Sequence, residues 1–278
     1  MRSRTWNRVF LTAVTYPFLL IIAVIVLYPV VWMVYSAFKP SADIFASIFG
    51  LPKTLYLGNF QIVFLKAGMG RYFLNSILVT AVSVAGLLGL CALEAYAFAT
   101  LRFRGKTALY VFVLLGFMVP PQALIISGYQ LISALHLLSS YPALILTYLS
   151  WSAFGVLVLR NFFESVPKSL LDAARIDGAS HWQVFRKLFV PLSGPSMATI
   201  AIFYTMWIYN EFMYPLVYMQ KQSMYTIPLG VLFLNSRYIT NWGLQMAGLA
   251  AATIPPVIAY IVFQKQFVRG IMAGALKG

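Results

Sequence analysis

Apolar residues gather in long runs along the chain, and short polar gaps separate these runs. Six of the runs hold about 20 mostly apolar residues, the length that a helix needs to cross the hydrocarbon core of a bilayer. The pattern therefore predicts an all-α transmembrane protein with a single membrane domain over 1–278. The six expected spans cover about 14–36, 72–99, 107–129, 141–163, 196–219 and 243–263.

The composition excludes a water-soluble fold. Hydrophobic residues make up 61% of the 278 residues and charged residues only 9%, whereas soluble domains carry about 25% charged residues. The first apolar run, 14–36, is longer than the apolar core of a signal peptide, which has about 7–15 residues. We therefore interpret it as a retained first helix.

The net charge of +14 comes from basic residues in the gaps between the spans. These residues lie where membrane topology requires them, which favours a membrane protein over a protein that binds nucleic acid. The positive-inside rule predicts that both termini are cytoplasmic. The basic residues then expected inside are Arg2, Arg4, Arg8, Arg102, Arg104, Lys106, Arg160, Lys168, Arg175, Arg186, Lys187, Lys265, Arg269 and Lys277, and those expected outside are Lys39, Lys53, Lys66, Arg71, Lys221 and Arg237.

Two pairs of prolines are expected to break spans. Pro120 and Pro121 lie in the third span, and Pro255 and Pro256 lie in the sixth. Each proline removes a backbone donor and clashes with the preceding turn. A static packing kink and a gating role both remain open, because a break in a membrane persists wherever neighbouring helices or water satisfy the freed carbonyls.

Two of the six acidic residues lie inside spans, where an ionisable group is costly and marks a candidate site. Glu94 lies near the end of the second span, close to Arg102 and Arg104. An ion pair or an interfacial carboxylate is its favoured role. Glu211 lies near the middle of the fifth span.

At helical spacing, Glu211 falls on a stripe of aromatic residues. Aromatic faces beside carboxylate and amide groups suit a polyhydroxylated solute, so the stripe predicts part of a solute pathway. Interhelical hydrogen bonds with interfacial aromatic rings are the alternative. The stripe holds Tyr204, Trp207, Glu211, Tyr214 and Tyr218, and the candidate pathway residues are Trp207, Asn210, Glu211 and Tyr214.

The gap at 164–195 is predicted to fold as helix, turn and helix. The run 169–176 favours a short helix, and Gly178 supplies a permissive backbone at its end. Ser180 is the candidate N-cap of a second helix, which is expected to run through Lys187. Two prolines are expected to stop that helix, namely Pro191 and Pro195.

The second helix of this loop has an apolar face. Trp182, Phe185 and Phe189 recur at helical spacing next to basic Arg186 and Lys187. A short amphipathic helix of this kind either lies on a lipid surface or packs into a groove of a partner protein.

The 164–195 loop resembles the EAA signature of ABC importer permeases. That signature reads Glu-Ala-Ala, three residues, Gly, nine residues, Ile, one residue and Leu-Pro. The spacing agrees throughout, with Asp, Leu and Val standing for Glu, Ile and Leu. The matching positions are Asp172, Ala173, Ala174, Gly178, Leu188, Val190 and Pro191.

Other stretches resemble the carbohydrate-uptake branch of these permeases, in particular the shorter maltose/maltodextrin-type chain. That branch carries Trp-Asn in the fifth span, whereas two residues separate Trp207 from Asn210 here. The similar stretches are Asn75–Ile77, Ala95–Ala99, Phe103–Gly105, Ala173–Ser180 and Phe267–Gly278.

The resemblance implies a type I ABC importer permease of about six helices in a bacterial inner membrane. It implies a second homologous permease chain, a cytoplasmic ATPase dimer and an extracytoplasmic solute-binding protein, with a sugar or oligosaccharide as the solute. The sequence lacks the Gly-x-x-x-x-Gly-Lys-[Ser/Thr] phosphate loop. The chain is therefore expected to be no enzyme and to bind no cofactor or metal, while the ATPase uses ATP and Mg²⁺. The residues implied in coupling to the ATPase are Asp172, Ala173, Ala174, Asp177, Gly178, Trp182, Phe185 and Pro191.

Three other classes compete with this interpretation. A proton-coupled secondary transporter would use Glu94 and Glu211 as proton carriers, but it predicts internal repeats, which the sequence lacks. A membrane-embedded enzyme needs a convergent acid–base or metal constellation, and the sequence offers none. A non-transporting assembly subunit predicts that substitution of Glu211 leaves uptake unchanged.

Overall fold

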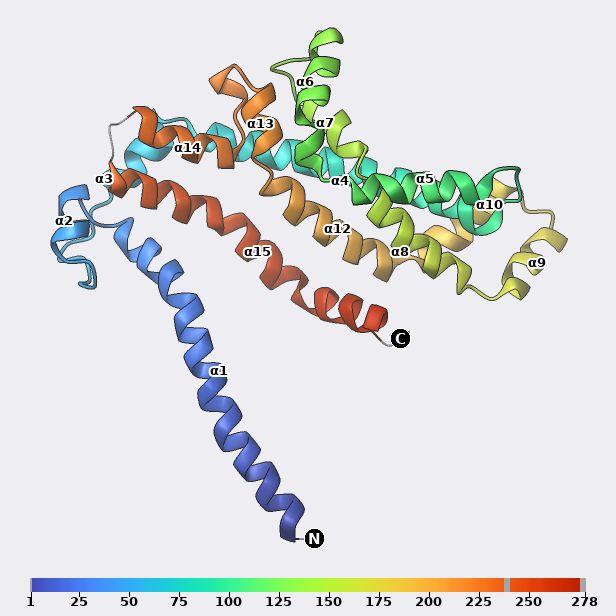
Figure 1. The fold of residues 1–278 in the computed structure, drawn as a ribbon, viewed down its shortest axis with the longest axis horizontal. Helices are drawn as coiled ribbons and strands as arrows, with labels where there is room; N and C mark the ends of the chain where they lie inside the picture. Colours follow the sequence, from blue (N-terminus) through green and yellow to red (C-terminus); the bar gives the residue numbers. More distant parts are fainter. Residues whose placement is uncertain (1, 238–240, 276–278) are drawn as a thin grey trace. The chain divides into compact units, whose positions relative to one another are not determined.

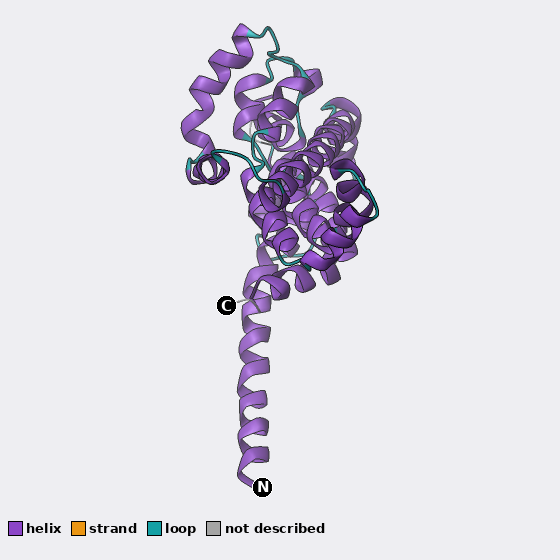
Figure 2. Ribbon diagram, turned by 90° about the vertical axis from the view of Figure 1, so that its right-hand side faces the viewer, coloured by secondary structure: helices purple, strands orange, loops and turns teal. Residues whose placement is uncertain are grey.

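The computed structural model describes residues 2–237 and 241–275, and the side chains of residues 14–234 and 241–264. Within these residues every regular element is a helix (Figure 2). The predicted all-α class is therefore confirmed. The chain divides into two compact units, Met1–Gly70 with Val231–Thr253 and Arg71–Gly230 with Ile254–Gly278. The single domain over 1–278 stays a prediction.

The first unit begins with the long helix α1, Arg2–Ser36, drawn in blue in Figure 1. Its apolar part, Val14–Ser36, is long enough to cross a membrane, and none of its most apolar window is buried inside the chain. The elements that follow are α2 (Ser41–Ala46), α3 (Gly58–Gln61) and the π-helical turn η1 (Ile62–Lys66).

A buried asparagine fixes the loop of the first unit to the end of α1. The Asn59 side-chain amide donates to the carbonyl oxygens of Ala37, at 2.9 Å, and Lys39, at 2.8 Å. Helix α15 (Trp242–Ala275) begins close to this site. A Cβ atom on Gly243 would lie 2.7 Å from the Asn59 side-chain amide nitrogen and 3.0 Å from the Lys39 carbonyl oxygen. Because two hydrogen bonds hold that amide in place, the site favours glycine.

The second unit holds most of the remaining helices, and α4, α14 and α15 each have residues in both units. The helices in chain order are α4 (Met69–Thr100), α5 (Lys106–Met118), η2 (Pro121–Leu124), α6 (Ile125–Ala134), α7 (Tyr141–Leu149), α8 (Ala153–Glu164), α9 (Lys168–Ile176), α10 (His181–Val184), η3 (Phe185–Phe189), α11 (Val190–Leu192), α12 (Gly194–Tyr209), α13 (Met213–Tyr218), η4 (Gln222–Met224) and α14 (Ile227–Arg237).

The candidate spans reach the six of the sequence pattern if each bent pair of helices counts as one span. Three helices are long and apolar enough to cross a membrane singly, and three bent pairs meet the same criterion together. The single helices are Val14–Ser36, Met69–Thr100 and Trp242–Gln264, and the pairs are Lys106–Met118 with Pro121–Ala134 (95°), Tyr141–Leu149 with Ala153–Glu164 (43°) and His181–Leu192 with Gly194–Tyr209 (74°).

The two proline pairs have different effects. The break at Pro120 and Pro121 is confirmed, because α5 ends at Met118 and the chain turns by 95°. The predicted break at Pro255 and Pro256 is wrong, since α15 continues through both prolines. A helix in a membrane tolerates proline where neighbouring groups satisfy the freed carbonyls.

The fifth span is shorter than the sequence predicts. Helix α12 ends at Tyr209, and the chain leaves helical geometry before α13 begins at Met213. The predicted continuous stripe from Tyr204 to Tyr218 is therefore wrong. The aromatic residues keep their helical spacing on both sides of the break, so this spacing alone gave no signal that the helix ends.

Asn75 fastens the start of α4 to a distant loop. Its amide nitrogen donates to the carbonyl oxygens of Ser223 (3.0 Å) and Tyr225 (2.9 Å), and its amide oxygen accepts from the Tyr141 hydroxyl at 2.6 Å. The neighbouring Ser76 hydroxyl accepts from a backbone N–H at 2.8 Å. The Asn75–Ile77 stretch therefore has a structural role at the end of the span.

Candidate functional site

The first half of the 164–195 loop is exposed. Helix α9, Lys168–Ile176, begins after Pro167 and has no buried residue. It ends at a turn where Gly178 has φ +75, a left-handed conformation that favours glycine. No atom lies within 4 Å of a Cβ built on Gly178, so backbone conformation rather than space requires glycine here.

The second half begins with the predicted N-cap. The Ser180 side-chain oxygen accepts from the Gln183 backbone N–H at 3.3 Å, and the Gln183 side chain accepts from the Ser180 N–H at 2.8 Å. This reciprocal arrangement is a capping box. Two unpaired donors of the first turn of α10 are thereby satisfied.

The predicted end of this second helix at Lys187 is wrong. Helical backbone continues through the π-helical turn η3 (Phe185–Phe189) and α11 to Leu192. Pro191 lies one residue before the end of this continuous helix and directly follows the π-helical turn η3 and Val190, and it removes one backbone donor there. The helix ends at Leu192, and the chain bends by 74° before α12.

The predicted apolar face of the second helix divides in two. Phe185 and Phe189 are buried, whereas Trp182 is 59% exposed. The Phe189 ring lies edge-on against Tyr96 of α4 and Phe163 of α8, at centroid distances of 5.2 and 5.0 Å. Phe185 and Phe189 therefore anchor the loop, while the ring of Trp182 remains exposed.

Tyr96 of α4 also makes a polar contact with the loop. Its hydroxyl donates to the His181 carbonyl oxygen at 3.1 Å and lies 3.3 Å from His181 Nδ1. The Tyr96 ring packs 5.3 Å from that of Phe185. Sequence reasoning missed this role of Tyr96, although the residue lies within the Ala95–Ala99 stretch noted above.

The residues implied in ATPase coupling differ in exposure. Phe185 is buried and Ala174 is half-buried, and the others are exposed, namely Asp172, Ala173, Asp177, Gly178, Trp182 and Pro191. Two exposed apolar residues of α9 were missed, Leu170 and Ile176, and Ile176 is 86% exposed. The helical period of α9 is the signal that identifies them.

Glu211 occupies the break between α12 and α13. Its carboxylate Oε1 accepts from the Met213 N–H at 2.9 Å, and Oε2 accepts from the Tyr214 N–H at 3.1 Å. The Tyr148 hydroxyl also donates to Oε2 at 3.2 Å. The carboxylate therefore satisfies the free donors at the start of α13.

The other pathway candidates lie in different surroundings. Trp207 is 40% exposed and packs edge-on against Phe154 at 5.1 Å. Tyr214 is buried, and its hydroxyl donates to the Pro121 carbonyl oxygen at 2.9 Å. That carbonyl lies at the break of the third span, so Tyr214 links two broken spans.

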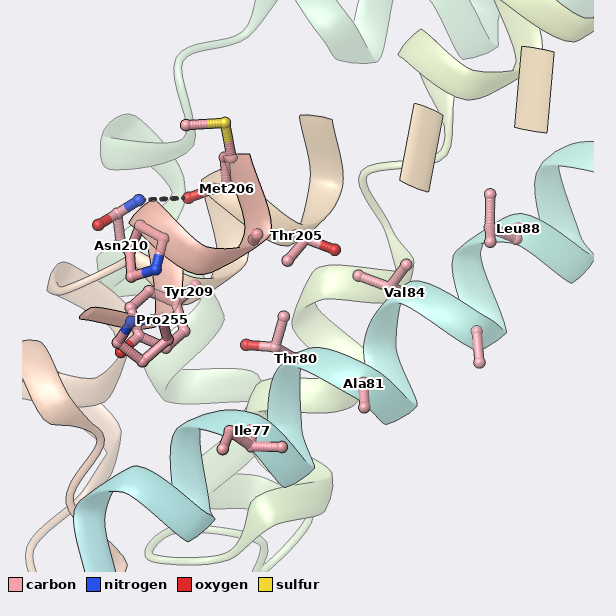
Figure 3. A pocket seen from close by; sticks show the side chains of 13 residues that line it. Ile77, Thr80, Ala81, Val84, Leu88, Thr205, Met206, Tyr209, Asn210 and Pro255 are labelled. Carbon is pink, nitrogen blue, oxygen red and sulfur yellow. Dashed lines mark hydrogen bonds between the residues drawn. The ribbon is translucent and has the colours of Figure 1, made fainter. Parts of the chain in front are cut away.

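A cavity of about 390 Å³ lies between α4, α12 and the second-unit part of α15. Figure 3 shows Thr80 and Val84 on α4 facing Thr205 of α12 across it. Asn210 is the one predicted pathway residue in its lining, and the Asn210 amide donates to the Met206 carbonyl oxygen at 2.7 Å. The lining residues are Ile77, Thr80, Ala81, Val84, Ala85, Leu88, Thr205, Met206, Tyr209, Asn210, Pro255, Pro256 and Ala259.

Tyr204 closes the break in the fourth span. Its hydroxyl donates to the Trp151 carbonyl oxygen at 2.7 Å and accepts from the Gly155 N–H at 3.0 Å. Trp151 lies in the break between α7 and α8, and Gly155 lies in the first turn of α8. The hydroxyl thus replaces backbone hydrogen bonds that the bent span lacks.

Glu94 binds next to the same break. Its carboxylate accepts from the Ser152 hydroxyl at 2.9 Å, so its partner is a serine instead of the expected arginines. The neighbouring Cys91 thiol, fully buried, lies 3.3 Å from the Ser152 carbonyl oxygen. Ser152 is thereby fixed to α4 through both its side chain and its backbone.

Comparison with known proteins identifies the family. A family model described as a binding-protein-dependent transport system inner membrane component matches residues 85–273. The chain belongs to this family. The permease is therefore a pore-forming subunit of a binding-protein-dependent importer and a multi-pass protein of the inner membrane.

Individual relatives extend over nearly the whole permease. It is 36% identical, over 94% of its length and 87% of the relative's, to YurM of Bacillus subtilis, a probable ABC transporter permease protein. It is 34% identical, over 92% of its length and 93% of the relative's, to the arabinooligosaccharides transport system permease protein AraQ of Halalkalibacterium halodurans. A solved bacterial ABC transporter involved in the import of alginate, an acidic polysaccharide, includes a chain with TM-score 0.79 and 25% identity, over 94% of this chain and 97% of that one.

Proposed function

We propose that this permease imports a sugar or oligosaccharide and couples to a separate ATPase dimer through the 164–195 loop. The carbohydrate class is supported by the relative AraQ, whose name states arabinooligosaccharides. ATP and Mg²⁺ are used by the ATPase, and this chain binds no cofactor. A second, homologous permease chain completes the pore, and both termini are cytoplasmic.

The observation that carries the coupling proposal is the contrast within the loop. The half that begins at Ser180 is anchored on α4 and α8 through Phe185 and Phe189, and it also bonds to Tyr96. The other half, α9, has no buried residue. An amphipathic helix held beside a fixed anchor is suited to pack into a groove of a partner protein. Displacement of the anchored half would then move α4.

Co-purification tests this coupling. Ile176→Asp and Trp182→Asp place a charge on residues that are 86% and 59% exposed, so the permease should fold while the ATPase dissociates and uptake is lost. Asp172→Lys should have the same effect through charge reversal. Leu135→Asp, on an exposed residue between the third and fourth expected spans, is the control. Wild-type recovery of ATPase with all three loop variants would refute the proposal.

We place the solute pathway beside the cavity between α4 and α12. Sugar hydroxyls require hydrogen-bonding groups, and the lining offers the hydroxyls of Thr80 and Thr205 and the amide of Asn210. Tyr209 supplies an aromatic ring. The role of Trp207, Glu211 and Tyr214 in the pathway stays a prediction.

Uptake kinetics test the pathway. Thr205→Val removes a hydroxyl at nearly constant shape, and Thr205→Ser keeps it. We expect Thr205→Val and Asn210→Ala to raise the KM of uptake severalfold, while Thr205→Ser and ATPase co-purification remain close to wild type. If the three variants transport the sugar alike, the cavity is not part of its route.

A further inference from the structure

The loop after α1 folds back along the helix from which it comes. The Trp32 indole N–H and the Tyr35 hydroxyl both donate to the Ile48 carbonyl oxygen, at 2.8 and 3.2 Å. Further along, the Phe49 ring lies 6.3 Å from the ring of Tyr28. The segment 45–51 therefore lies beside the last two turns of α1.

This geometry sets the depth of the segment relative to the span. The span Val14–Ser36 has 23 residues, about 34 Å at 1.5 Å per residue, and the hydrocarbon core is about 30 Å thick. Tyr28 lies about 12 Å from Ser36 along the helix axis. A ring that touches Tyr28 is therefore about 10 Å inside the hydrocarbon edge when the span is centred.

The exposed side chains of the segment suit that depth. Phe49 is 80% exposed and Leu51 is 76% exposed, and Ile48 and Phe45 are exposed as well. They continue the apolar surface of α1, whose most apolar window is not buried by the described chain. Trp32 and Tyr35 are residue types that gather at membrane interfaces.

Several backbone groups of the segment have hydrogen-bond partners within the protein. Backbone groups at membrane depth must be satisfied within the protein. The Ile48 carbonyl accepts two hydrogen bonds from α1. The Ser47 carbonyl accepts from the Lys39 ammonium at 3.0 Å and from the Gly50 N–H at 3.3 Å.

We propose that residues 45–51 enter the leaflet at the Ser36 end of α1, and that Ile48, Phe49 and Leu51 contact lipid acyl chains. The segment thereby anchors the loop between the first two spans to the bilayer. A loop that faced water or the solute-binding protein would be expected to extend away from the membrane instead of folding back along α1 to the level of Tyr28.

Spin labelling tests this placement in the assembled transporter, reconstituted in phosphatidylethanolamine and phosphatidylglycerol vesicles. Phe49→Cys and Leu51→Cys, made in a Cys91→Ala background, are compared with Lys53→Cys on the same loop. We expect the ratio of collisions with oxygen to collisions with a water-soluble nickel chelate to be severalfold higher at 49 and 51 than at 53. High nickel accessibility at 49 and 51 means exposure to water, low accessibility to both reagents means cover by protein, and either result overturns the proposal.

A second measurement needs no substitution. A lipid-soluble phenyl diazirine is photolysed in vesicles that contain the wild-type transporter, and the adducts are mapped by mass spectrometry. We expect adducts on residues 45–51. Adducts that occur on α1 but are absent from 45–51 would contradict acyl-chain contact.

Discussion

The permease breaks its helices in two kinds of place, and the two are closed differently. Between α9 and α10 the break lies in the exposed 164–195 loop, and its polar groups are satisfied by neighbours in sequence, Ser180 and Gln183. Within the spans, side chains distant in sequence take part: Tyr204 closes the break before α8, and at the break before α13 Glu211 accepts from nearby Met213 and also from Tyr148 of another span. Water can replace a partner at an exposed break, whereas hydrocarbon cannot.

The residues at the span breaks hold the membrane helices together. Tyr204 and Glu211 connect broken spans to their neighbours, and so does Tyr214, which bonds to the Pro121 carbonyl. A side chain that closes a break has a structural role whether or not it meets the solute. Transport effects of these residues therefore need a parallel measurement of stability.

The largest expected effect is at Glu211. Glu211→Leu removes three hydrogen bonds, from Met213, Tyr214 and Tyr148. The donors of Tyr214 and Tyr148 are part-buried, and each unsatisfied buried group costs about 1–3 kcal/mol, so the fold should lose about 2–3 kcal/mol. The loss should appear as a lower midpoint for helix melting, followed by circular dichroism in detergent.

Glu211→Gln is the matched control for that loss. Its amide oxygen still accepts hydrogen bonds, so it should recover most of the stability. If Glu211→Leu melts like the wild type, the carboxylate does not close the break.

Tyr204→Phe should have the next largest effect. It leaves the Trp151 carbonyl without its donor and the Gly155 N–H without its acceptor. Side-chain hydrogen bonds in membrane proteins average about 0.6 kcal/mol, so two of them predict a loss of about 1–2 kcal/mol in the same assay.

The control for Tyr204→Phe is Tyr129→Phe, on a half-buried tyrosine of α6. It should melt close to wild type, because neither Tyr204 nor Glu211 uses the Tyr129 hydroxyl to close its break. Equal losses in the two variants would mean that the hydroxyl of Tyr204 has no special part in closing the bend.

These two kinds of break also explain what sequence could predict. Gly178 and Ser180 act on their own neighbours, so their roles were predicted and confirmed by the backbone conformation and the capping box. The break before α8 depends on Tyr204, 53 residues from Trp151, and Glu211 accepts from Tyr148 across 63 residues. No local pattern encodes such pairs.

The two candidate sites also differ in how far local sequence could predict them. The spacing of the loop residues identified the family, because that signal is local. The fifth-span stripe assumed an unbroken helix, and so it grouped Glu211 with Trp207 although Glu211 lies beyond the end of α12. Of the candidate pathway residues, only Asn210 lines the cavity. The walls of this cavity come from three helices far apart in sequence.

At the exposed break, Gly178→Ala should cost less than the membrane substitutions. A side chain at φ +75 costs about 1 kcal/mol, and the α9–α10 turn can relax into open space, since nothing lies within 4 Å of the new Cβ. We expect weaker binding of the ATPase with little change in melting.

Gly178→Asn is the matched control, since asparagine tolerates the left-handed conformation better than alanine. It should bind the ATPase more tightly than Gly178→Ala. The reverse order would show that the positive φ does not limit docking.

The smallest expected effect is at Ser180. Ser180→Ala removes the side-chain half of the capping box, a change that costs about 1 kcal/mol of local helix stability. Because the Gln183 N–H is exposed, water replaces the lost acceptor, and the loss should stay within α10. Hydrogen exchange measured by mass spectrometry should speed up over 181–184, while the global melting midpoint is unchanged. Ser165→Ala is the control, because it removes another hydrogen bond of an exposed serine hydroxyl. It should leave the exchange over 181–184 unaltered. If Ser180→Ala instead lowers the melting midpoint as much as Tyr204→Phe does, exposure to water does not distinguish the two kinds of break.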